Sequence, residues 1–150
     1  MLRRRREPGR ASNREMEENG VKRVIGPEEA VSGLLPVPGG GGRFSILIDN
    51  QLGGSSNFSL LVNEVVGGYR SKAHAHPEEQ CFYILSGRGR ISIEDVEYEV
   101  GPGTAAFAPA NSLHQVEAYG DEPLRYVLIY APQGPERDLR EKGEKAFSGR

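Results

Sequence analysis

Short apolar runs, separated by glycine, proline or polar residues, make up most of this chain. The runs are rich in Val, Ile, Leu, Phe and Tyr, and the 20 glycines and 10 prolines lie mainly between them. Such runs, bounded by turn residues, predict β-strands joined by tight turns. The predicted strands are Phe44–Asp49, Phe58–Val66, Gln80–Leu85, Gly89–Ile93, Val96–Val100, Ala105–Ala108, His114–Ala118 and Leu124–Tyr130.

Apolar and polar residues alternate from Ile91 to Val100, with Glu94-Asp95 in the middle. This pattern predicts a β-hairpin that turns at Glu94-Asp95. Strands at regular spacing without intervening helices are typical of an all-β sandwich or jelly roll.

The two ends of the chain differ from the middle. Residues 1–20 begin with four arginines and offer little to bury, so we expect a disordered basic extension. No apolar segment follows the arginines, which argues against a secretory signal, and we hypothesise that translation begins at Met16. Residues 21–43 form an N-terminal arm with a glycine-rich loop at 36–43, and 21–37 is expected to add an edge strand, against a second subunit.

The barrel itself is predicted to span residues 44–131, followed by a polar tail at 132–150. Within the tail, Glu136 to Phe147 has a helix-forming composition and predicts a short surface helix, which Gly143 interrupts.

Length and charge limit the possible functions. A chain of 150 residues is one domain, and a net charge of −2 requires no nucleic-acid partner. No apolar stretch approaches the length of a membrane span. The single cysteine, Cys81, excludes an intramolecular disulfide and a cysteine-based zinc site, and it fits a cytoplasmic location.

All three histidines lie within 41 residues, as the pair His74-Ala-His76 and as His114. Side chains alternate along a strand, so His74, His76 and Gln80 can share one face. Imidazole and amide oxygen are both metal ligands, although a His-x-His pair by itself is also compatible with unrelated surface histidines. Glu78 has the same parity as the pair and is an alternative fourth ligand, but Pro77 interrupts the strand before it.

The residues around the histidines resemble the two motifs of the cupin superfamily. The first motif, G-x5-H-x-H-x3-E-x6-G, and the second, G-x5-P-x-G-x2-H-x3-N, are matched in spacing over roughly residues 44–131. The matching positions are Gly68, His74, His76, Gln80 and Gly87 in the first motif, and Gly103, Pro109 and His114 in the second. The resemblance implies a double-stranded β-helix, the cupin jelly-roll barrel. It also implies one divalent metal ion held by His74, His76, Gln80 and His114.

Three positions depart from these motifs. Gln80 replaces the usual glutamate ligand, a variant that the family contains, while Asn111 and Ala118 replace a glycine and an asparagine. Asn111 and Ala118 bear on backbone shape, so only Gln80 alters the chemistry of the site. Spacing back from Gly87 also favours Gln80 over Glu78 as the fourth ligand.

Three imidazoles and an amide carry no formal negative charge. A divalent ion there would keep its full positive charge, which favours anionic ligands and stabilises negative charge on an oxygen. The ligand types are compatible with Fe, Mn, Ni or Zn and do not identify the metal.

The alternation of side chains along each strand also predicts which residues face the barrel interior. Phe82 and Ile84 share the face of Gln80 and are candidate substrate contacts. In the last strand, an inward-facing Tyr126 or Tyr130 would be a candidate proton donor. If Arg125 faced inward instead, it would be a candidate clamp for a carboxylate; the alternative is a surface Arg125 with the tyrosines in the core.

We therefore predict a metal-dependent enzyme that acts on a small oxygenated anion, such as a keto acid, a sugar acid or a polyketide fragment. The chemistry would be an isomerase, cyclase or lyase reaction through a stabilised enolate. An Fe(II)-dependent dioxygenase and a non-catalytic cupin that binds a small molecule are the alternatives. A homodimer is expected, and neither nucleic acid nor membrane is an expected partner.

Overall fold

The computed structural model describes residues 21–37 and 39–141, so the predictions for residues 1–20, including Met16, and for 142–150 lie outside it. A 3₁₀ helix and nine strands follow one another along the described chain. They are η1 (Pro27–Glu29), β1 (Val31–Leu34), β2 (Gly42–Ile48), β3 (Ser59–Val65), β4 (Glu79–Ser86), β5 (Arg88–Ile93), β6 (Val96–Val100), β7 (Ala105–Ala108), β8 (His114–Tyr119) and β9 (Leu124–Ala131).

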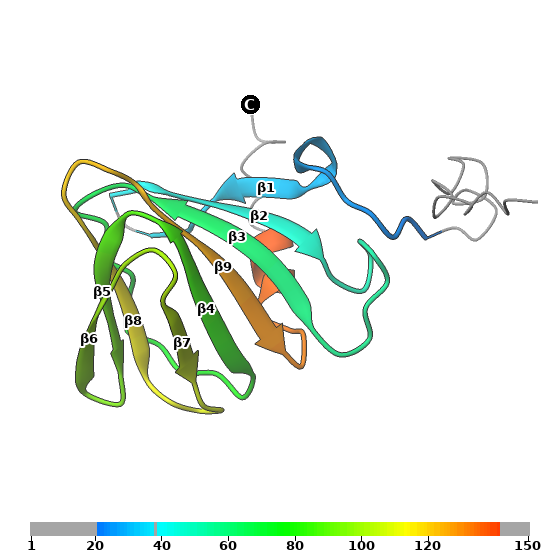
Figure 1. The fold of residues 1–150 in the computed structure, drawn as a ribbon. Coiled ribbons are helices and arrows are strands. Elements are labelled where there is room, and N and C mark those ends of the chain that lie inside the picture. The colour runs from blue at the N-terminus through cyan, green and yellow to red at the C-terminus, as the bar shows by residue number, and fades with distance from the viewer. Residues whose placement is uncertain (1–20, 38, 142–150) are drawn as a thin grey trace, which may run out of the picture.

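The strands form two antiparallel sheets, which confirms the all-β prediction. The larger sheet has the order β1-β2-β3-β9-β4-β7, and the smaller has the order β6-β5-β8. Figure 1 shows β5, β6 and β8 together on the left, with the larger sheet running from β7 across to β1. The segment before β4 joins β8 through isolated bridges at Arg70↔Glu117 and His74↔His114, so it extends the smaller sheet.

Alternation of side chains decides which residues form the core. On β4, Phe82 and Ile84 are each 1% exposed, whereas Tyr83 between them is 46% exposed. On β9 the buried positions are Leu124, Tyr126, Leu128 and Tyr130. The apolar faces of both sheets therefore point into the barrel, where burial of their side chains stabilises the fold.

The observed strands include the eight predicted ones, with small differences at their ends. The hairpin turns where expected, and Glu94 and Asp95 both have left-handed φ values, 51° and 65°, as a two-residue type I′ turn requires. The expected edge strand is β1, which pairs with β2 of the same chain. Strand β2 begins at Gly42, so the glycine-rich loop is shorter than predicted.

The helix after the barrel has a buried side that the prediction of a surface helix did not include. Residues 136–141 are helical, but Glu136 is completely buried. One of its oxygens, Oε2, accepts hydrogen bonds from Ser59 Oγ (2.9 Å) and from the backbone N–H of Gly134 (2.8 Å). Arg140, on the same helix, forms an ion pair of 2.6 Å with the buried Asp49. These contacts therefore hold the C-terminal helix, orange-red in Figure 1, against the barrel.

Among the described residues, no helix has both the length and the apolar character that crossing a lipid bilayer would need.

Candidate metal centre

Backbone hydrogen bonds bring the histidines together. His74 lies in the segment before β4, and His114 is the first residue of β8. The N–H of His74 donates to the carbonyl of His114 (3.1 Å), and the N–H of His114 donates back (2.9 Å). His76 follows two residues after His74, and its carbonyl accepts from the N–H of Asn111 (2.8 Å). Two distant parts of the chain thus place all three rings at one end of the barrel.

Each imidazole is oriented by a backbone carbonyl. The Nδ1–H groups of His74, His76 and His114 donate to the carbonyls of Lys72 (2.8 Å), Glu78 (2.9 Å) and Ser112 (3.0 Å). A proton on Nδ1 leaves the lone pair on Nε2, which is the arrangement of histidines that bind metals. One ring nitrogen of each histidine lies within 4.8 Å of those of the other two. The three histidines are therefore a group that could hold a metal ion.

Two observations show that the site suits a cation. Nε2 of His114 is buried and has no hydrogen-bond partner among the described residues. Nε2 of His76 lies 2.9 Å from Oε1 of Gln80, a side chain that is only 3% exposed. With the His76 proton on Nδ1, both of these atoms are acceptors, unless the amide is turned to place its nitrogen there. Two neighbouring ligand atoms of one octahedral ion would lie about 3 Å apart, given bonds of about 2.1 Å. The distance of 2.9 Å between these two atoms matches that spacing.

The alternative ligand, Glu78, occupies a different place. Its carbonyl orients His76, and its carboxylate lies near Gly134 at the start of the C-terminal segment. Glu78 lines the cavity beside the histidines, whereas Gln80 is the side chain in contact with His76.

Burial keeps His114 neutral. Loss of solvent around the ring lowers the pKa of His114 to about 4, and repulsion from His74 and His76 acts in the same direction. The hydrogen bond to Ser112 opposes this effect without reversing it. Because only a neutral imidazole can bind a metal, the low pKa leaves His114 available at neutral pH.

Two motif positions bind no metal but are explained by the backbone around them. Asn111 has a φ of 63°, a left-handed conformation that asparagine tolerates and glycine prefers. A Cβ on Gly87 would lie 2.3 Å from the carbonyl oxygen of Pro123, so a side chain there would collide with the backbone. The substitution at Asn111 therefore preserves the turn that supports His76.

The histidines open into a cavity of about 700 Å³ inside the barrel. Phe82, Tyr126 and Tyr130 line it, in agreement with their expected inward direction. Ile84 is buried but is not among the lining residues, because it lies deeper in the core, paired with Tyr126. The expectation that Ile84 contacts substrate is therefore not supported.

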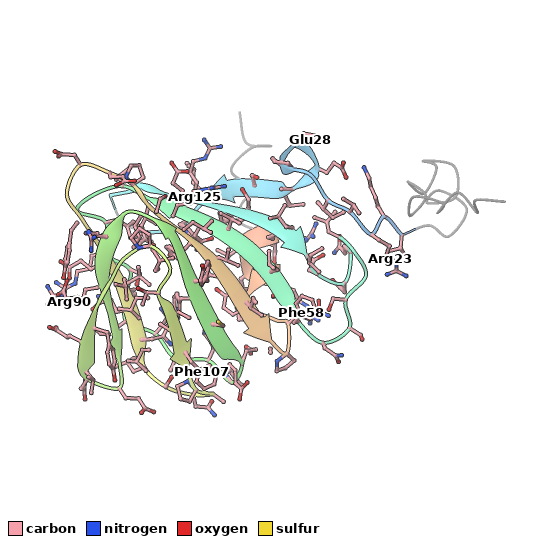
Figure 2. The ribbon with its side chains drawn as sticks, in the orientation of Figure 1. Arg23, Glu28, Phe58, Arg90, Phe107 and Arg125 are labelled. Carbon is pink, nitrogen blue, oxygen red and sulfur yellow. The ribbon has the colours of Figure 1, made fainter. Side chains whose placement is uncertain are left out.

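Arg125 cannot clamp a ligand in this cavity. Its side chain is exposed on the outer face of β9, since Tyr126 and Tyr130 occupy the inner face. Figure 2 labels Arg125 toward the top of the larger sheet. The surface alternative for Arg125 is the correct one.

Both inner tyrosines remain protonated at neutral pH. Burial raises the pKa of Tyr126 and of Tyr130 far above the usual value of a phenol. The ring of Tyr130 also lies edge-on to His76, with 5.6 Å between ring centroids. Each phenol can therefore donate a hydrogen bond within the cavity, and neither can act as a base.

The sequence analysis missed several residues that line the cavity. Asn63 shares the inward parity of Leu61 and Val65, and this polar residue among apolar neighbours was the available signal. The C-terminal helix contributes Arg137 and Leu139, which no local pattern places there because their position depends on how the helix docks.

Parts of two curated proteins are similar in sequence to this chain. An uncharacterised protein of Methanocaldococcus jannaschii is 30% identical over 66 residues, and a glucose-6-phosphate isomerase of Thermococcus kodakarensis is 31% identical over 81 residues. These matches cover 43% and 50% of this chain, and 53% and 42% of the relatives, so the chain spans about half of their length.

The solved structure of the polyketide cyclase RemF from Streptomyces resistomycificus has a similar fold. Its TM-score is 0.67 at 24% identity, over 77% of this chain and 82% of that one. Residues 61–130 match the family model described as a cupin domain. With two antiparallel sheets and the histidine group at one end, residues 61–130 are a domain of the cupin superfamily.

Proposed function

We propose that this protein is a metal-dependent enzyme whose substrate is a small oxygenated anion. The observation that carries the proposal is the convergence of three imidazoles and one amide in the cavity of the barrel, with the buried Nε2 of His114 left without a partner among the described residues. His74, His76, Gln80 and His114 would hold the ion. A bound divalent ion supplies positive charge that polarises a substrate oxygen and stabilises negative charge developing on it.

The rest of the cavity suits a reaction in which such charge develops, as in isomerisation, cyclisation or elimination by a lyase. The inner part of the wall is apolar at Phe82 and Leu128, and a substrate that covers it would displace water and strengthen electrostatic interactions inside. Tyr130, beside His76, is positioned to donate a hydrogen bond to a substrate oxygen. Glu78 is the carboxylate on the cavity wall closest in sequence to the histidines and is our candidate base. The name of the structurally similar polyketide cyclase supports a cyclisation of this kind.

Lys72 and Arg137, rather than Arg125, are the candidate cationic contacts for a substrate carboxylate. Both line the cavity, and both are exposed enough to meet an arriving ligand. They can attract a carboxylate toward the histidine group. Asp138 and Glu78 also line the cavity, so a substrate with both anionic and hydroxyl groups fits the mixed charges better than a simple polyanion.

The first experiment is metal analysis of protein purified without a metal-affinity step, comparing wild type with His114→Ala. Glu79→Ala is the matched control, because Glu79 is an exposed neighbour of Gln80 outside the cavity lining. We expect nearly one metal ion per chain in wild type and control, and little in His114→Ala. Protein that contains no metal and binds none on titration would contradict the proposal and leave a metal-free ligand-binding barrel.

The same experiment separates redox from non-redox chemistry. An Fe(II) dioxygenase uses the same four ligands, and iron as the native metal would favour it. In that case the iron-loaded protein would consume oxygen when supplied with catechols or diketones. Zinc has no redox chemistry, so substrate conversion by the zinc-loaded protein would favour the isomerase, cyclase or lyase reaction instead.

We also propose a homodimer through the outer face of the larger sheet. Tyr83 and Phe107, from neighbouring strands, are 46% and 54% exposed, and Val127 lies beside Tyr83 on the same face. Exposed apolar side chains grouped on one face are typical of an interaction surface, and a second copy presents the same side chains. Sedimentation of wild type and Phe107→Glu tests this: we expect a dimer that the charged variant converts to monomer.

A further inference from the structure

A second polar cluster lies at the opposite end of the cavity from the histidines. Asn63 on β3 and Tyr126 on β9 are direct partners in the sheet, and both line the cavity. Along β9, Tyr126 lies four residues from Tyr130, which pairs with Gln80. At about 3.3 Å per residue, roughly 13 Å of strand separates these two levels.

Apolar side chains fill the wall between the two levels. Phe82 and Leu128 are partners across β4 and β9, and both line the cavity. The ring centroid of Phe82 lies 6.2 Å from that of His114 and 6.0 Å from that of Tyr126. The cavity therefore has a polar end at the histidines, an apolar middle and a second polar end at Asn63.

Not every polar group of this second cluster, called the deep cluster below, has a hydrogen-bond partner. Asn63 is 4% exposed, and its Nδ2 donates one long hydrogen bond of 3.5 Å to the hydroxyl of Tyr126. Its Oδ1 is buried without a partner among the described residues. Rotating the amide by 180° would place Oδ1 against the Tyr126 hydroxyl and leave Nδ2 unpaired instead. Buried amides are nearly always paired, so an unpaired one on a cavity wall suggests a missing ligand.

Tyr69 completes the cluster. It is 6% exposed and lies close enough to Tyr126 for the two phenols to interact electrostatically. Gly42 makes room for its ring, because a Cβ there would lie 2.9 Å from Cε2 of Tyr69. Burial raises the pKa of Tyr69 to about 12, so its hydroxyl keeps its proton at neutral pH. The cluster thus offers one acceptor from the amide and two phenolic donors.

We propose that Asn63, Tyr69 and Tyr126 form a second ligand-binding subsite, which recognises a hydroxyl or carbonyl group at the far end of the substrate. The substrate class is an elongated, mainly aromatic or alicyclic molecule with oxygen groups at both ends. One end lies at the histidines, the apolar body packs on Phe82 and Leu128, and the other end is hydrogen-bonded by the deep cluster. This inference rests on the proposed function, because it takes the histidine group as the anchor of the first end.

The test uses the zinc-loaded full-length protein and two biphenyl probes. The probes are phenylcatechol and its analogue with one added hydroxyl at the para position of the distal ring. Calorimetric titration should give about tenfold tighter binding of the hydroxylated probe, because a site built to hydrogen-bond a hydroxyl rejects a ligand that lacks it. In Asn63→Leu and in Tyr126→Phe the preference should largely disappear, while the affinity for phenylcatechol stays near that of wild type.

Tyr83→Phe is the control, because it removes a phenolic hydroxyl from the outer face of β4 and should keep the preference. Equal affinity of wild type for both probes, or a preference that survives in both variants, would overturn the subsite. So would a marked fall in the Tm of Asn63→Leu, which would show that the amide supports the fold. If neither probe binds, the subsite is rejected, and zinc titration decides the proposed function separately.

Discussion

Nε2 of His76 lies 2.9 Å from Oε1 of Gln80, although the hydrogen bond from His76 to the carbonyl of Glu78 places the ring proton on the other nitrogen. Two lone pairs at this distance repel one another unless a donor or a cation lies between them. As the proposed fourth ligand, the neutral amide would complete a ligand set with no negative charge, and this sets the expected behaviour of the site.

Substitutions of Gln80 should lower or raise the affinity for metal, depending on whether they remove the side-chain oxygen or add a negative charge. Gln80→Ala removes the proposed fourth ligand and should weaken zinc binding by at least about 10-fold, because loss of even a hydrogen-bond partner behind a ligand has an effect of this size. Gln80→Glu adds a carboxylate and should strengthen it, while weakening the binding of anionic ligands at the loaded site. Isothermal titration of zinc, then of oxalate, measures both effects. Stronger oxalate binding in Gln80→Glu would contradict the electrostatic argument.

The stability of the metal-free protein should depend on pH through His114. Its pKa is about 4 when folded and about 6.5 when unfolded. Between these values the unfolded chain binds more protons, so stability is complete above pH 6.5 and falls as the pH drops toward 4. The loss approaches about 3 kcal/mol, and urea denaturation in EDTA at pH 7 and 4.5 measures it. His114→Gln should show a smaller loss; an unchanged loss would assign the effect to other groups.

Removing Arg140 should destabilise the protein by leaving a buried charge without its partner. Asp49 is 1% exposed and pairs with Arg140, so Arg140→Ala is expected to cost about 3 kcal/mol. Arg137→Ala, on the exposed side of the same helix, should cost less than about 0.5 kcal/mol. Urea denaturation of both variants makes the comparison. Similar losses in the two would mean that helix propensity, rather than the ion pair, dominates.

Arg137 and Arg125 should differ in their effect on ligand binding. Arg137 lines the cavity, whereas Arg125 lies on the outer face. We expect Arg137→Ala to weaken binding of an anionic probe such as oxalate by about threefold to tenfold, the modest effect of an exposed charge. Arg125→Ala should leave it unchanged. A larger effect from Arg125→Ala would place the anion elsewhere on the molecule.

The sequence by itself determined the strands and the parity of their side chains. Period-two alternation is local, so Phe82 and Tyr83 had to point in opposite directions once β4 formed. The resemblance of the segments around His74, His76 and His114 to the two cupin motifs likewise indicated one site.

Only the tertiary structure decided which face of each strand is the inner one and what closes the barrel. The alternation on β9 allowed either Arg125 or Tyr126 to face inward, and packing of the two sheets placed Tyr126 inside, because burying a charged arginine costs more than burying a phenol. The C-terminal helix docks through Glu136 to Ser59 and Arg140 to Asp49. Those contacts join residues 77 and 91 positions apart, so no local pattern could predict them.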